Sequence, residues 1–341
     1  MLICAMSFKT IIISRTDAIG DVVLTLPMAV FIKERLPDCK IVFLGRNYTN
    51  DVVTACSAVD EFVSWDNIAQ NAAEEIKNLH ADAIIHVFPR KELAKAAKEA
   101  GIPVRIGTSH RIFHLSTCNR RIRFSRKRSD LHEAQLNFFL LKGLGFFEIP
   151  KLDELRKFYL LNRIHPLHHE LAKLLHLDRF RIILHPGSRG SAREWGIDHF
   201  AELIVLLPPD RFQIFVTGTE KEGELFRSEL CTPFSHVNDL SGKLSLGELI
   251  GFIHQCDVLV AASTGPLHIA AAAGIFAVGI YPPIKPMHPG RWAPLGKNAK
   301  VFVAEKECSD CRGGLPCHCM REISAQSVAE YIAASVGRTK R

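Results

Sequence analysis

Two acidic residues occupy a short loop near the start of the chain, at a place where many α/β proteins hold a phosphate. The stretch IIISRTDAIGDVVLTLP, residues 11–27, has the pattern of a buried strand, a loop and the first turn of a helix, and it contains Asp17 and Asp21. A carboxylate repels a phosphate, but it can remove a proton from an acceptor hydroxyl. Asp21 is therefore a candidate general base, with helix capping as the structural alternative. Asp17 is expected to be a solvated loop residue.

A glycine-containing loop in the second half of the chain has the features of an anion site. The apolar run 257–263 leads into STGPLH, residues 263–268, and then into an alanine-rich helical pattern. Glycine permits close approach of the backbone, proline suits the first turn of a helix, and the free amides of that turn attract negative charge. A plain strand-to-helix turn is the structural alternative. The residues expected to bind a diphosphate are Ser263, Thr264, Gly265 and His268.

Two further loops of the second half carry polar residues that suit the same ligand. The stretch HPGSRGSAREWGIDHF, residues 185–200, combines small residues with two arginines, whose fixed charges match a diphosphate. The stretch VTGTEKEGE, residues 216–224, offers one carboxylate for the hydroxyls of a ribose or sugar, while Glu220 is expected to be an acidic first-turn residue. The candidates for donor binding are Ser188, Arg189, Arg193 and Glu222.

Alternating strand and helix patterns position all of these loops. Both halves contain short apolar runs such as TIIIS, KIVFLG, FRIILH and DVLVAAS, separated by helical stretches. This alternation predicts βαβ units and a parallel sheet in each half, so the fold class is α/β. The candidate loops then fall at the carboxyl ends of strands, where such sheets bind ligands. The predicted domains are residues 1–165 and 166–341.

The composition and charge of the chain limit the classes of function that it can have. No apolar run reaches the ~20 residues of a membrane span, and the N-terminal stretch lacks the basic leader of a secretory signal, so a cytoplasmic location is expected. The net charge is +7, and residues 105–129 hold eight Lys or Arg and no acid. A solvated basic face is the default interpretation of such a run. Nucleic-acid binding is not expected, because no recognition motif accompanies the charge.

The ten cysteines do not have the pattern of a disulfide scaffold. Four of them cluster as CSDCRGGLPCHC and have the residue types of a zinc site. A C-x-C pair is cramped for one tetrahedral site, and we therefore expect neither a metal nor another cofactor. The four are Cys308, Cys311, Cys317 and Cys319.

Taken together and in order, the motifs resemble those of the bacterial lipopolysaccharide heptosyltransferases, glycosyltransferase family nine. The resemblance is carried by SRTDAIGDVVLTLP, ILHPGSRGSAREWGIDHF, DLSGKLSLGELIGFIHQCDVLVAASTGPLHIAAAAG and IYPP, and it covers most of the chain. It implies a GT-B fold, in which two Rossmann-like domains with parallel sheets face each other across a cleft. The N-terminal domain would bind the acceptor and the C-terminal domain the nucleotide sugar.

The resemblance also implies roles for single residues. Asp21 matches the proposed base of the family, and Thr264, Gly265 and His268 match its nucleotide-diphosphate loop. Two other matches are Arg193, where relatives carry a lysine that contacts the donor, and Glu222, at an acidic donor contact. One position departs from the family pattern, because Ser263 stands where an aspartate usually contacts the sugar. The departure leaves the diphosphate site intact and weakens the case for heptose as the sugar.

The expected function is that of an inverting, metal-independent glycosyltransferase that moves a sugar, expected to be heptose from ADP-heptose, to a lipopolysaccharide core acceptor. The absence of any Asp-x-Asp triplet in the sequence agrees with metal independence. The basic segment 105–129 in the acceptor domain suits a lipid-linked anionic saccharide and peripheral contact with the inner membrane, and the candidates for acceptor binding are Arg120, Arg121 and Arg123. Two alternatives remain open: a nucleotide-sugar epimerase on the same fold, and a non-catalytic nucleotide-sugar-binding protein.

Overall fold

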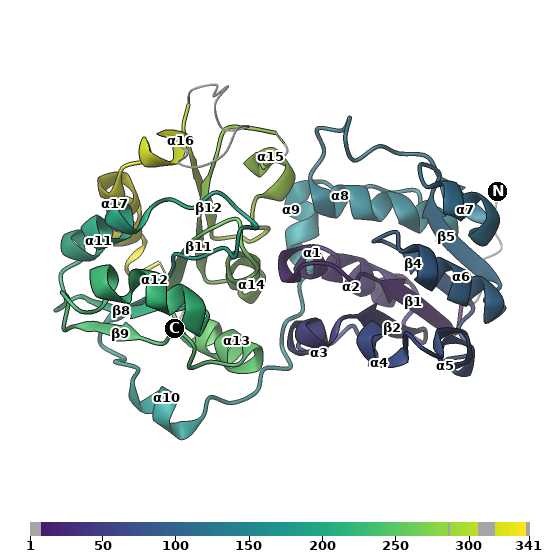
Figure 1. Ribbon diagram of the computed structural model, residues 1–341, viewed down its shortest axis with the longest axis horizontal. Coiled ribbons are helices and arrows are strands. Elements are labelled where there is room, and N and C mark those ends of the chain that lie inside the picture. The colour runs from purple at the N-terminus through teal and green to yellow at the C-terminus, as the bar shows by residue number, and fades with distance from the viewer. Residues whose placement is uncertain (1–7, 286, 306–317, 339–341) are drawn as a thin grey trace. The chain divides into compact units, whose positions relative to one another are not determined.

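A computed structural model describes residues 8–285, 287–305 and 318–338 (Figure 1). The chain divides into two compact units, Met1–Arg163 and Ile164–Arg341. No helix within the described ranges combines the length and apolar character needed to cross a bilayer.

The first unit is built on a parallel sheet of six strands in the order β3-β2-β1-β4-β5-β6. Ile13 of β1 lies between Phe43 of β2 and Ile85 of β4, which fixes the register of the three central strands. The strands are β1 (Thr10–Ser14), β2 (Lys40–Gly45), β3 (Glu61–Ser64), β4 (Ala83–His86), β5 (Val104–Thr108) and β6 (Arg120–Ile122).

Helices lie on both faces of this sheet (Figure 1). Ile12 packs in one apolar cluster with Ile76 and Leu93, and its neighbours Ile11 and Ile13 are equally buried although they point to the opposite face. The α-helices are α1 (Ile19–Val23), α2 (Leu26–Arg35), α3 (Asn50–Thr54), α4 (Trp65–Ile68), α5 (Ala72–Asn78), α6 (Lys91–Glu99), α7 (Ile112–Thr117), α8 (Glu133–Phe138) and α9 (Leu152–Leu155). The 3-10 turns are η1 (Asn47–Thr49), η2 (Phe139–Leu144) and η3 (Arg156–Phe158).

The second unit contains another six-stranded parallel sheet, in the order β12-β11-β10-β7-β8-β9. Its strands are β7 (Phe180–His185), β8 (Phe212–Val216), β9 (Val237–Asp239), β10 (Val258–Ala262), β11 (Phe276–Tyr281) and β12 (Ala299–Val303). Its helices are α10 (His169–Lys173), α11 (Ile197–Leu206), α12 (Glu220–Leu230), α13 (Leu246–Gln255), α14 (Gly265–Ala273), α15 (Pro289–Trp292), α16 (His318–Arg321) and α17 (Ala325–Ser335). Helix α17 packs beside α11, and both contribute to one apolar cluster over the sheet.

Both sheets have the same strand order when each is numbered from its own first strand. In each, the first strand stands between the second and the fourth, so the direction of winding reverses beside it. Open parallel sheets bind ligands at this reversal, beyond the carboxyl ends of the strands. The places to examine are therefore the loops after β1 and β4 in the first unit, and after β7 and β10 in the second. The predicted α/β class with two parallel, Rossmann-like sheets is confirmed.

Candidate active site

Asp21 lies in the first turn of α1, at the reversal point of the first sheet. The residue that flanks this helix is Ala18, whose side chain makes no capping hydrogen bond, and Asp21 is the third helical residue. The helix-capping alternative for Asp21 is therefore wrong. Its carboxylate instead accepts a hydrogen bond from Arg15, which stands just after β1.

Arg15 holds both loop carboxylates at once. The residue is 3% exposed. Its Nε donates to Asp17 Oδ1 at 2.7 Å, its Nη2 donates to Asp21 Oδ1, and its Nη1 donates to Asn137 Oδ1 at 3.1 Å. The expectation that Asp17 is a solvated loop residue is wrong, because the buried guanidinium fixes its side chain.

Residues on and just before helix α8 also contact Arg15 or its partners. The Glu133 carboxylate lies 3.3 Å from Arg15 Nη1 and accepts from Arg126 Nε at 2.9 Å, and the residue is 1% exposed. Arg126 Nη2 also donates to Asn137 Oδ1 at 2.8 Å, and Asn137 Nδ2 donates to the carbonyl of Leu24, just after α1. Arg126 is thus no part of a solvated basic face, contrary to the default interpretation of its segment. We call these six side chains the base network: Arg15, Asp17, Asp21, Arg126, Glu133 and Asn137.

The base network changes the proton affinity of Asp21. Burial raises the pKa of this carboxyl to about 6; Arg15 opposes the rise, while the like charges of Asp17 and Glu133 add to it. A carboxylate with a pKa near neutral is a stronger base than an ordinary one and is still ionised at pH 7. For Arg15, burial lowers the pKa, but the three carboxylates outweigh burial, and the guanidinium stays charged.

In the second unit, the two loops predicted to bind the diphosphate lie at neighbouring strand ends. Strands β7 and β10 are paired, with His185 opposite Ala261, so the loops that follow them leave the sheet at the same edge. This is the reversal point of the second sheet.

The loop after β10 contains a buried hydroxyl without a partner. Thr264 flanks α14 but caps none of its amides, and Gly265 and Pro266 are the first two helical residues. The side-chain oxygen of Thr264 is buried and has no hydrogen-bond partner among the described residues. A buried polar atom left unsatisfied costs about 1–3 kcal/mol, a cost that a ligand oxygen at this place would remove. His268 is buried in the same first turn, and Ser263 hydrogen-bonds to Tyr281.

The loop after β7 is held in shape by its own side chains. Ser188 Oγ donates to Glu194 Oε1 at 2.7 Å and accepts from the Gly190 amide at 3.2 Å. Arg189, between them, adopts a left-handed conformation with φ of +51° and is exposed, whereas Arg193 is partly buried. Ser188 therefore shapes the turn that presents the two arginines.

Glu222 has one engaged and one unengaged carboxylate oxygen. Its Oε2 accepts from the Thr219 amide at 2.8 Å and from the Thr219 hydroxyl at 2.7 Å, which caps α12. Its Oε1 is buried without a partner in the described part of the chain and lies against the place where a Cβ on Gly187 would stand. Glycine at 187 is required for this close approach. Nearby, burial lowers the pKa of His185 to about 4, so this side chain is neutral at pH 7.

The three arginines predicted to bind the acceptor lie on β6 or just beyond it. Arg120 Nη1 donates to the Gly143 carbonyl at 2.5 Å, and Arg121 Nη1 donates to the Leu115 carbonyl at 3.1 Å. These two side chains brace the edge of the sheet. Arg123 is exposed.

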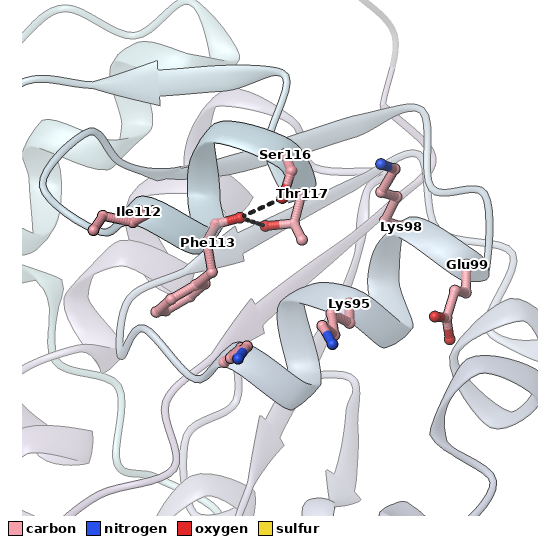
Figure 2. Close-up of a pocket in the computed structure, with 8 residues that line it drawn as sticks. Lys95, Lys98, Glu99, Ile112, Phe113, Ser116 and Thr117 are labelled. Atoms are coloured by element: carbon pink, nitrogen blue, oxygen red, sulfur yellow. Dashed lines mark hydrogen bonds between the residues drawn. The ribbon is translucent and has the colours of Figure 1, made fainter.

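An open groove of about 690 Å³ lies between α6 and α7 of the first unit (Figure 2). Sequence reasoning missed it, although lysines at positions 91, 95 and 98 share one face of a helix. Across the groove, Ile112 is 86% exposed, and Leu115 on the same helix is exposed as well. The groove is lined by Lys91, Lys95, Lys98, Glu99, Ile112, Phe113, Ser116 and Thr117.

The predicted cysteine cluster lies mostly outside the described residues, which include neither Cys308, Cys311 nor Cys317. Cys319 is buried in the apolar cluster of the second unit. Among the residues that the structure describes, no three histidine, cysteine or acidic side chains are grouped as a metal site would require.

Comparison with known proteins identifies the family. Residues 71–316 match the model of glycosyltransferase family 9 (heptosyltransferase). The chain belongs to glycosyltransferase family 9. The matched range contains β7, β10 and both loops that follow them, so the family pattern includes the reversal point of the second sheet.

Relatives of this family 9 chain match it over most of its length. A Haemophilus influenzae protein named only as a glycosyltransferase is 27% identical over 84% of this chain and 86% of its own. Lipooligosaccharide heptosyltransferase 2 of Campylobacter jejuni is 24% identical over 92% of this chain and 93% of its own. The solved structure of Escherichia coli ADP-heptose LPS heptosyltransferase II is 20% identical, with a TM-score of 0.74 over 96% of this chain and 98% of its own. The expected GT-B architecture of two Rossmann-like domains agrees with this likeness.

Proposed function

We propose that this family 9 glycosyltransferase moves heptose from ADP-heptose to a lipopolysaccharide core acceptor, with inversion at the anomeric carbon and without a metal. The observation that carries the proposal is Asp21, a carboxylate of raised proton affinity held by Arg15 at the reversal point of the first sheet. The names of the relatives, which include heptosyltransferases and one ADP-heptose LPS heptosyltransferase, support the donor and the acceptor class.

The second unit is assigned the donor. The first-turn amides of α14 and the hydroxyl of Thr264 would bind the diphosphate, with Arg193 and Arg189 balancing its charge. These groups stabilise the charge that develops on the leaving nucleotide diphosphate, which is the role that fixed donors perform in a transition state. Glu222 Oε1 is assigned to a sugar or ribose hydroxyl, which would supply its missing hydrogen bond.

The first unit is assigned the acceptor and the base. An acceptor hydroxyl oxygen attacks the anomeric carbon from the face opposite the diphosphate, the carbon–oxygen bond to phosphate breaks, and Asp21 takes the hydroxyl proton. General-base assistance of this kind contributes roughly 10²–10⁴-fold to the rate. His268 and Ser263 complete the donor assignment, and Ser263, being neutral, places less charge beside the sugar than the family aspartate does.

The acceptor is proposed to be a lipid-linked anionic saccharide, met at the cytoplasmic face of the inner membrane. The lysines of the α6–α7 groove and the exposed Arg123 offer positive charge to phosphate groups, and exposed Ile112 offers an apolar contact to lipid (Figure 2). Co-sedimentation with vesicles tests the membrane contact. We expect binding to vesicles that contain phosphatidylglycerol, and equal binding to purely zwitterionic vesicles would contradict it.

Thermal shift with ADP, GDP, UDP and CMP, each with and without an attached sugar, tests the donor assignment. A ligand at 100 times its Kd adds about 2.7 kcal/mol, so the expected shift with ADP and the larger shift with ADP-heptose are measurable. The transfer assay is then run on Asp21→Asn. We expect a loss of at least roughly 10²-fold in kcat with ADP binding retained. Full activity of this variant would remove the general base from the proposal, and no shift with any nucleotide would favour another function.

A further inference from the structure

We propose that Glu133 and Arg126 are positioning residues for the catalytic base, acting on Asp21 through Arg15. The inference rests on the proposed function, because it takes Asp21 to be the base. Neither residue belongs to the motifs that carry the family resemblance, and both stand far along the chain from the loop that holds Asp21.

The geometry of Arg15 gives the first argument for this inference. Its guanidinium is planar and buried, and its three nitrogens have different partners: Asp17 at Nε, Asp21 at Nη2, and Glu133 with Asn137 at Nη1. A guanidinium held on three sides cannot turn, so the orientation of the Asp21 carboxylate is fixed by groups on α8 as well as by its own loop.

The charges of the base network give the second argument. Three carboxylates, Asp17, Asp21 and Glu133, share the single guanidinium of Arg15, and Glu133 also meets the guanidinium of Arg126. Glu133 is almost completely enclosed, whereas the Asp17 and Asp21 side chains, both bound to Arg15, keep 22% and 20% of their surface exposed. Burial raises the pKa of Asp21 to about 6, and the charges of Asp17 and Glu133 add to the rise, so Asp21 is placed to take a proton from a substrate.

The free-energy cost of burying Glu133 is the third argument. A buried carboxylate at 1% exposure is expensive even when paired, and apolar residues of similar volume often give equal or greater stability. Stability alone therefore does not account for a glutamate at position 133. Its negative charge competes with Asp21 for Arg15, and this weakens the Arg15–Asp21 pair enough for Asp21 to accept a proton.

Two other titratable side chains on elements near Asp21 have hydrogen-bond partners of their own. Tyr48 of η1 donates its hydroxyl to the Asp17 carbonyl at 2.6 Å, and burial raises the pKa of this phenol, so it stays neutral. On α3, which packs against α1, Asp51 accepts from Asn50 Nδ2 at 3.2 Å.

The experiment is the pH dependence of kcat/KM for two variants that change the charge near Asp21 in opposite directions. Glu133→Gln keeps the size of the side chain and removes a negative charge, so we expect the acidic limb to move down by roughly one pH unit, the order of shift that a nearby charge produces. Arg126→Gln removes a positive charge, and we expect the limb to move up. Glu133→Asp keeps the charge and should return the limb toward that of the wild type.

Opposite shifts of the acidic limb in the two variants would distinguish an electrostatic effect on Asp21 from a structural defect. A structural defect lowers kcat/KM without moving the acidic limb in a direction set by the charge that was removed. ADP-induced thermal stabilisation checks that each variant is folded, and Glu34→Gln, at an exposed carboxylate on α2, is the matched control with an unchanged profile. If Asp21→Asn is inactive while both charge variants keep the wild-type limb, the inference is overturned and the proposed function stands. If Asp21→Asn retains full activity, the proposed function fails, and the inference fails with it.

Discussion

Replacing the proposed catalytic base by asparagine is expected to make the protein more stable. Asp21 has an ordinary pKa of 3.8 in the unfolded chain and about 6 in the folded protein. The folded state therefore binds this proton more tightly, and the ionised carboxylate is held at a cost. A rise of about two pH units corresponds to about 3 kcal/mol of unfolding free energy. An asparagine at this position would keep the neutral hydrogen-bonding shape without that cost.

The direction of the pKa shift of Asp21 determines the pH range over which the two proteins differ in stability. Because the folded pKa is raised, the stabilising contribution of protonated Asp21 is complete below about pH 4 and is lost as the pH rises through about 6. The advantage of Asp21→Asn over the wild type should therefore be nearly complete, at about 3 kcal/mol, by pH 7, fall to about half of that at pH 5, and vanish in more acidic solution.

Urea unfolding at pH 5, 7 and 8, followed by fluorescence and circular dichroism together, measures the difference. Asp17→Asn is the matched control, because Asp17 meets the same guanidinium at 2.7 Å and its loss should lower stability at each pH. If Asp21→Asn is less stable than the wild type at pH 8, the ion pair with Arg15 outweighs the burial of Asp21. A gain that does not change with pH would also refute the argument. Gain of stability with loss of activity is the usual trade-off at a catalytic site.

Three further substitutions test the two sheets. Thr264→Val should weaken ADP binding about tenfold in calorimetric titration and leave the ligand-free Tm unchanged or higher, because it removes a buried hydroxyl without a partner in the described part of the chain; unchanged affinity would contradict the donor assignment. Gly187→Ala would drive a methyl group into Glu222 Oε1, so both ADP affinity and Tm should fall. Gly107→Ala would place a methyl group 2.6 Å from the His114 ring and 2.9 Å from Cys118. It should lower the free energy of unfolding in urea by about 1–3 kcal/mol without changing ADP affinity.

The fold could be predicted from the sequence where strands are buried on both faces. Runs such as TIIIS, KIVFLG and FRIILH are apolar throughout because helices cover each side of a parallel sheet. Most strands missing from that pattern are outer ones, although the inner strand Val104–Thr108, with the sequence VRIGT, also lacks a continuous apolar run. Examples of outer strands are Glu61–Ser64, Arg120–Ile122 and Val237–Asp239, which are three or four residues long and only partly buried. An outer strand has water on one side, so its sequence carries little apolar signal.

The site could be predicted only where its residues follow a strand. The loops at residues 185–195 and 263–268 can be located because strand ends at a reversal point bind ligands. The base network cannot be predicted beyond Asp21, because the partners of Arg15 on α8 are separated from it by 118 and 122 positions. Spacing along a sequence says nothing about such contacts. The default interpretation of Arg126 is wrong for a related reason: in a segment with eight basic residues, composition cannot distinguish those that bond within the fold from those that face solvent.

Asp21 follows β1, the strand that corresponds to β7 of the second sheet, where we propose that a phosphate binds. After β7 and β10, glycines and the N-terminus of α14 offer backbone amides, and the proposed ligand, a diphosphate, would bring the negative charge. After β1, the positive charge is the buried guanidinium of Arg15, and the negative charge is the carboxylate of Asp21. The same topology thus positions a complete guanidinium–carboxylate pair in the first unit and, in the proposed function, a site for an anion in the second. A leaving diphosphate requires the first kind of site, and removal of a proton requires the second.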